Sequence, residues 1–173
     1  MKIELRTLVI AIIIGVALDI LTTFISVNIM GDGELNPSFP HPGIFFFTSS
    51  LILLFVSVWF LHLAKYFHFE RANEFKAKDL FFKSLSPNIR YYLKTTEGRS
   101  ILGFWLAICG LLFGVMKAWA GINNLSNMIF GLGWVDILYV EAQFWHFWLA
   151  NAVNISVSLV LCFFFVRRLH KIG

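Results

Sequence analysis

Long apolar segments alternate with shorter polar ones along the whole chain. A helix that crosses the hydrocarbon core of a bilayer needs about 20 mostly apolar residues. The segments that reach this length cover residues 7–30, 43–67, 100–122 and 137–166. The pattern therefore predicts an all-α fold: a polytopic membrane protein whose single domain, residues 1–173, is a bundle of four transmembrane helices.

The polar segment 68–99 separates the second apolar segment from the third. Within it Phe75, Phe82 and Leu85 recur at helical spacing among Lys and Glu residues, which predicts an amphipathic linker helix on the membrane surface. Ser86 and Pro87 interrupt the pattern, so a second short helix is expected after them.

Composition excludes an ordinary soluble domain. Hydrophobic residues make up 58% of the chain and charged residues 14%, against about 45–50% and about 25% in average soluble domains. The mean hydropathy of +0.76 leads to the same conclusion, because one core of this size cannot bury so much apolar surface. Disordered, coiled-coil, collagen-like and disulfide-scaffold classes are excluded by the same figures.

The distribution of charge predicts the orientation. Lys and Arg occur before residue 7, between 68 and 99, and after 166, whereas the connections 31–42 and 123–136 contain none. Because cytoplasmic loops carry the excess of Lys and Arg, we expect both termini on the cytoplasmic side of the cell membrane. The net charge of +4 follows this distribution, so we expect the lipid bilayer as partner and no nucleic acid.

Polar side chains inside the apolar segments are the candidate functional residues, because an ionisable group in a bilayer costs several kcal/mol and usually has a use. In the first segment Asp19, Thr22 and Thr23 share one face of a helix. In the third, Lys117 lies beside a ridge of small residues whose core is Gly103, Gly110 and Gly114. In the fourth, the candidates are His146, Asn151 and Asn154.

Each of these features also has a structural interpretation. The glycine ridge predicts close helix packing, and the Asn side chains are suited to hydrogen bonds between helices. Lys117 either extends to the outer interface or pairs with a carboxylate, for which Asp19, Glu34, Asp136 and Glu141 are the candidates.

The first outer connection adds polar groups beside the outer end of the polar face formed by Asp19, Thr22 and Thr23. Glu34 and Asn36 belong to the ligand-binding candidates. Asp32, Glu34 and His41 are weak candidates for a metal site, because carboxylate and imidazole ligands suit divalent cations. The density of Gly, Asn and Pro in this connection is more typical of a structural turn.

The string from Asp19 to Thr23, D-I-L-T-T, is followed by G-E-L-N-P from Gly33 to Pro37. This combination resembles an uncharacterised prokaryotic integral-membrane family, known only as a domain of unknown function, with the pattern D-x-x-T-T then E-x-N-P. The likeness covers about residues 18–37. It implies a shared first helix and loop, and it brings no established activity.

Three functions are compatible with this pattern. The first is a polar intramembrane pocket, open to the outer face, that binds or conducts a small cation, proton or polar solute. The second is an accessory or structural subunit of a larger membrane complex. The third, a metal-assisted membrane enzyme, ranks last because the chain has no HExxH, GxSxG, P-loop or similar catalytic motif. Four helices are few for a transporter, so we expect a homo-oligomer or a hetero-complex with other membrane subunits.

Overall fold

A computed structural model of the chain describes residues 5–30, 44–85, 88–131 and 144–169. These ranges are helical and contain no strand, so the predicted all-α class is confirmed for them. The elements in chain order are α1 (Leu5–Ile25), the π-helical segment η1 (Ser26–Met30), α2 (Ile44–Tyr66), the 3-10 segment η2 (Phe69–Glu74), α3 (Ala77–Ser84), α4 (Ile89–Lys94), α5 (Thr96–Phe130) and α7 (Phe144–Leu169).

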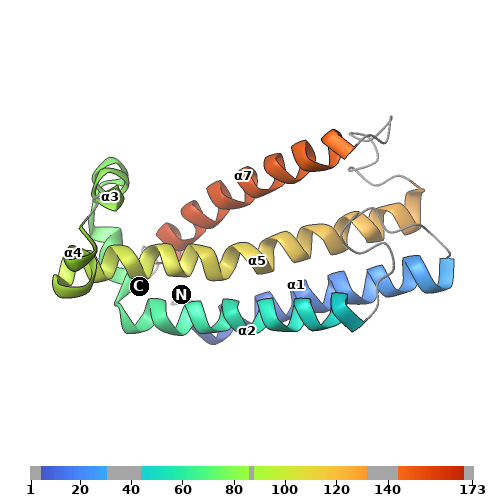
Figure 1. Ribbon diagram of the computed structural model, residues 1–173, viewed down its shortest axis with the longest axis horizontal. Helices are drawn as coiled ribbons and strands as arrows, with labels where there is room; N and C mark the ends of the chain where they lie inside the picture. The colour runs from blue at the N-terminus through green and yellow to red at the C-terminus, as the bar shows by residue number, and fades with distance from the viewer. Residues whose placement is uncertain (1–4, 31–43, 86–87, 132–143, 170–173) are drawn as a thin grey trace.

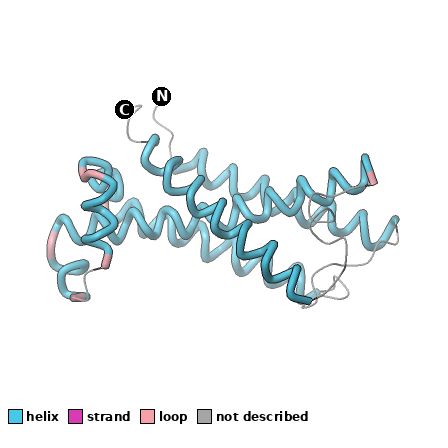
Figure 2. Tube along the Cα trace, turned by 90° about the horizontal axis from the view of Figure 1, so that it is seen from above, coloured by secondary structure: helices cyan, strands magenta, loops and turns pink. Residues whose placement is uncertain are grey.

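The long helices α1, α2, α5 and α7 alternate in direction (Figure 1). α1 and α5 point one way along the bundle, and α2 and α7 point the other way. The short elements η2, α3 and α4 gather at the end where α2 ends and α5 begins, which we call the linker end. α5 is the central helix, because it packs against α1, α2 and α7. Figure 2 shows that α7 crosses the other long helices obliquely.

Three helices are long and apolar enough to cross a membrane. They are Arg6–Ile29, Phe47–Tyr66 and Thr96–Phe130, whereas the apolar stretch described in α7, Ala152–Arg167, is shorter. The fourth predicted segment, 137–166, overlaps α7, and residues 137–143 lie outside the described ranges. The fourth membrane span therefore stays a prediction.

α5 is longer than the sequence pattern predicted. It begins at Thr96, where the Thr95 side chain accepts a hydrogen bond from the Gly98 amide at 2.9 Å. It continues past the expected end at residue 122 and ends at Phe130. Gly131 then adopts a left-handed conformation (φ 67°) that terminates the helix. The expectation that the outer connection begins at residue 123 is therefore wrong, because the segment contains no helix breaker before Gly131.

Glycines let α5 approach its neighbours closely. A Cβ atom at Gly114 would lie 3.0 Å from Cα of Ile12 in α1. A Cβ atom at Gly110 would lie 2.9 Å from the Ser57 carbonyl oxygen in α2. The two glycines of the G-x-x-x-G motif thus contact different helices, one on each side of α5. This arrangement matches the role of small residues in apolar helix pairs.

The linker is not one amphipathic helix. Phe75 has extended backbone angles (φ −79°, ψ 146°) and ends η2, so it precedes α3 instead of sharing a helix with Phe82. His68, with a left-handed conformation (φ 54°), makes the turn between α2 and η2. These two breaks correct the predicted continuous helix, whereas the expected second short helix is present as α4.

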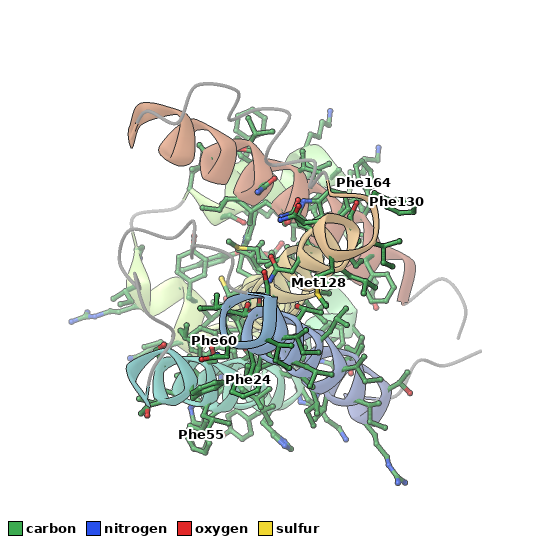
Figure 3. All side chains as sticks on the ribbon, turned by 90° about the vertical axis from the view of Figure 1, so that its right-hand side faces the viewer. Phe24, Phe55, Phe60, Met128, Phe130 and Phe164 are labelled. Carbon is green, nitrogen blue, oxygen red and sulfur yellow. The ribbon has the colours of Figure 1, made fainter. Side chains whose placement is uncertain are left out.

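The outer surface of the long helices is largely apolar. Phe55 of α2 is 69% exposed, and Figure 3 shows its ring pointing away from the bundle. Ile14 of α1 and Phe164 of α7 are also exposed, at 62% and 61%. Water would disfavour such a surface, which is what the hydropathy of the segments predicts for helices in contact with lipid.

The glycine contacts predict a large effect of bulk at one position. Gly114→Leu should lower the melting temperature of the purified protein by about 3–10 °C, because the new side chain meets the backbone of α1 and overpacks the interface. Thermal unfolding followed by tryptophan fluorescence measures this shift. Cys109→Leu is the control, because Cys109 is exposed on the same helix. Equal melting temperatures of the two variants would contradict the close packing of α1 on α5.

Candidate functional site

The most polar contact between the long helices is an ion pair. Lys117 Nζ of α5 donates a hydrogen bond to Oδ2 of Asp19 in α1, over 2.7 Å. The Asp19 side chain is 5% exposed and that of Lys117 is 19% exposed. Among the four carboxylates proposed from the sequence as partners of Lys117, the structure therefore brings Asp19 to it. The ring of Phe113 lies below the ammonium group, with its centroid 5.9 Å from Nζ.

Close packing of the two helices brings these residues together. Gly121 lies one helical turn beyond Lys117, and a Cβ atom there would lie 2.9 Å from the backbone nitrogen of Asp19. Gly15 lies one turn before Asp19 and directly against Gly114 and Ala118. α1 and α5 therefore touch by their backbones both before and after the ion pair.

Two threonines and an asparagine continue the polar contact toward the far end of the bundle. Asn124 Nδ2 donates to Thr23 Oγ1 at 3.0 Å and lies 3.4 Å from Thr22 Oγ1. The Thr22 hydroxyl donates to the backbone carbonyl of Leu18 at 2.8 Å. We call the set Asp19, Thr22, Thr23, Lys117 and Asn124 the polar layer.

Of the five residues of the polar layer, one side chain is acidic and one is basic. The ammonium of Lys117 and the carboxylate of Asp19 share one hydrogen-bonded proton, and its transfer would convert the ion pair into a neutral pair with the same net charge. A carboxylate offers about four acceptor positions. In the part of the chain that the structure describes, the one hydrogen bond to the Asp19 carboxylate is that from Lys117.

The sequence singled out three of these five residues as one stripe. It placed Lys117 beside the glycine ridge, with Asp19 as one of four candidate partners, and it missed Asn124. Residues 117, 121 and 124 are spaced by four and three, so they share a helix face. This spacing could have identified Asn124 if the helix had been extended beyond residue 122. On α2, Ser50 and Ser57 are also buried, at 1% and 3% exposed, although the polar residues of this segment form no coherent stripe in the sequence.

Other predicted site residues do not join the polar layer in the described structure. Asn154 of α7 is half-buried, and no hydrogen bond between described residues links it to the layer. His146 and Asn151 belong to α7, but their side chains lie outside the described part. The candidates of the first outer connection, Asp32, Glu34, Asn36 and His41, lie outside the described residues. The described residues contain no group of three or more His, Cys, Asp or Glu side chains that could hold a metal ion.

The ion pair predicts strongly unequal effects of single and double substitutions. Lys117→Met should lower the free energy of unfolding by about 3–5 kcal/mol, because it leaves the Asp19 carboxylate buried without a counter-charge. Adding Asp19→Asn should recover most of that loss. Thermal melts of the two single variants and the double variant measure this coupling.

Lys65→Met is the matched control, because Lys65 is an exposed lysine on α2 and should tolerate the change. If the double variant is no more stable than Lys117→Met alone, the two side chains do not interact as a pair.

No family model matches this chain, no curated protein matches it, and no solved structure matches it. The resemblance through D-x-x-T-T and E-x-N-P therefore stays a prediction. Only the first half of that pattern lies in the described ranges, where Asp19, Thr22 and Thr23 belong to the polar layer.

Proposed function

We propose that the chain is a multi-pass membrane protein whose polar layer binds a proton or a small polar solute inside the bilayer. The observation that carries the proposal is the ion pair between Asp19 and Lys117, buried between two helices with apolar outer surfaces. A buried ion pair is weak support for stability, since apolar residues of similar volume are often equally good. An ionisable pair at membrane depth is therefore better explained by function.

The position of the pair along α5 supports this proposal. Lys117 lies midway between Phe104 and Phe130, about 20 Å from each at a rise of 1.5 Å per residue. The hydrocarbon core of a bilayer is about 30 Å thick. If α5 spans it with Phe104 near the inner interface, the ion pair lies well inside the membrane.

The charge balance of the layer favours a proton or a neutral solute over a metal cation. A metal cation would have to displace the ammonium group that already neutralises Asp19, at 2.7 Å. A proton can instead move along the existing hydrogen bond without changing the net charge. The hydroxyl and amide groups of Thr22, Thr23 and Asn124 offer further hydrogen bonds to a solute that enters beside the pair.

The orientation proposed from the sequence agrees with the arrangement of the elements. The linker end carries the basic segment 68–99, and α1 begins and α7 ends toward that end. Placing this end in the cytoplasm satisfies the positive-inside rule. The polar layer then lies in the part of the bundle closer to the outer connections.

Proton movement through the polar layer predicts a pH-linked flux. In vesicles that hold the purified protein and an entrapped pH-sensitive dye, an imposed membrane potential should acidify or alkalinise the interior faster than in protein-free vesicles. Asp19→Asn should reduce the rate to that of protein-free vesicles, because the amide neither releases nor takes up a proton as an acid or base near neutral pH.

Asp79→Asn is the matched control, since Asp79 lies in α3 outside the long helices and should leave the flux unchanged. Equal flux of wild type and Asp19→Asn would overturn a role for Asp19 in proton movement. In that case native mass spectrometry of the gently extracted protein would test for a bound small solute, which Asp19→Asn should remove.

A second function, an accessory subunit of a larger membrane complex, is favoured by the surface of α7. Large apolar side chains of α7 are exposed on several sides of the helix, and its buried described residues, Ser158, Cys162 and Val166, form a single line with a four-residue spacing. Such a helix has free surface for a second membrane protein.

The same mass spectrometry separates the two functions. An accessory subunit should be extracted together with larger, different chains, whereas a protein that acts by itself should appear alone or as a homo-oligomer.

A further inference from the structure

The two short helices of the linker expose an unusually apolar surface. On α3 and directly after it, Phe81, Phe82 and Leu85 are 55%, 70% and 63% exposed. On α4, Ile89 and Leu93 are 71% and 48% exposed. We call these five residues the linker face. The opposite side of α3 is anchored to the bundle by Leu80, which is fully buried.

Exposed basic side chains belong to the same short helices as the linker face, or directly precede them. Between Lys76 and Arg99 the chain carries six basic and two acidic residues. One of the acidic residues, Glu97, is paired with Lys83 and therefore does not offset the remaining positive charge. The side chains of Lys76, Lys78, Arg90 and Lys94 are exposed. Lys78 lies on the same side of α3 as Phe82 and Leu85, because these residues follow it by four and seven positions.

Hydrogen bonds hold the linker face in a fixed position relative to the bundle. The Tyr92 hydroxyl of α4 is shared between the carbonyl oxygens of Lys83 and Ser84 at the end of α3, at 2.9 and 2.7 Å. Trp105 of α5 donates its indole N–H to the Ser84 hydroxyl. The linker face is therefore preorganised as a surface.

Two further groups attach this region to α5 and α7. Arg167 of α7 donates to the carbonyl oxygen of Phe75, just before α3, at 3.0 Å. Burial and a hydrogen bond to the Glu97 carboxylate raise the pKa of Tyr91 to about 12, so its hydroxyl remains protonated at neutral pH. Both contacts tie the short helices to the long ones.

From this juxtaposition we propose that the linker face binds the surface of an anionic lipid bilayer. The apolar side chains enter the boundary between headgroups and acyl chains, and Lys76, Lys78, Arg90 and Lys94 bind the lipid phosphates. Surfaces that combine aromatic and aliphatic side chains with Lys and Arg are typical of helices that lie in the membrane interface. Anionic headgroups attract such basic clusters, whereas zwitterionic ones do not. This site lies at the linker end, apart from the polar layer, and its occupant is lipid instead of a transported solute.

The full-length protein in a neutral detergent tests the proposal by lipid titration. Phosphatidylglycerol at about ten times its Kd should raise the melting temperature by about 3–6 °C, and phosphatidylcholine should not. The variant Lys76→Gln/Lys78→Gln/Arg90→Gln/Lys94→Gln should bind phosphatidylglycerol more weakly by roughly 600-fold, since each of the four basic residues contributes about fivefold. Without lipid its melting temperature should equal that of the wild type, because none of the hydrogen bonds that anchor the linker face uses these side chains.

Arg6→Gln/Lys65→Gln is the control, since both residues are exposed but belong to α1 and α2.

A second variant, Phe82→Ser/Leu85→Ser, should weaken the binding of phosphatidylglycerol while keeping its preference over phosphatidylcholine. Equal responses to the two lipids, or equal losses in the charge variant and the control, would overturn the proposal and favour a protein partner for this surface. Proton flux should not depend on the charge variant, so this proposal and that for the polar layer can fail separately.

Discussion

The short distance between α1 and α5 is the constraint on which the packing of the other helices and the position of the ion pair depend. Three glycines, Gly15, Gly114 and Gly121, let the two backbones touch, and a Cβ atom at any of them would lie within 3.0 Å of an atom of the other helix. In a bilayer the hydrophobic effect does not drive helices together. Apolar helices there associate through such close van der Waals contact and through polar groups between them. The close approach sets the level at which Asp19 meets Lys117, and it fixes α5 as the helix around which the others pack.

The ion pair between Asp19 and Lys117 depends on that close packing of α1 and α5. Two charged groups between apolar helices are tolerated because they neutralise each other over 2.7 Å. The same neutrality makes the polar layer suitable for a proton or an uncharged solute, which is the function we propose. Thr22, Thr23 and Asn124 extend the layer with groups that can both donate and accept hydrogen bonds.

The two ends of the bundle differ in chemistry. The linker end carries exposed Lys and Arg together with the apolar linker face, and hydrogen bonds from Tyr92 and Trp105 attach it to the long helices. Past Lys117, α5 continues through Asn123 and Asn124 to Phe130, where the sequence led us to expect a loop. A protein with a basic linker end suits a bilayer whose inner surface is anionic. Both proposals place the linker end at that inner surface.

Hydrophobic periodicity and length by themselves determined the helical class. They also placed the ends of three long apolar helices to within a few residues, except the end of α5, which extends to Phe130. They also placed Asp19, Thr22 and Thr23 on one face, because a helical wheel depends only on residue spacing. Only the tertiary structure decided which carboxylate meets Lys117, since that choice depends on the relative height of two helices far apart in sequence. It also showed that Gly110 and Gly114 contact different helices, that Asn124 joins the polar layer, and that the linker breaks at Phe75. Local spacing carries no information on such contacts, because the packing of backbones against one another sets them.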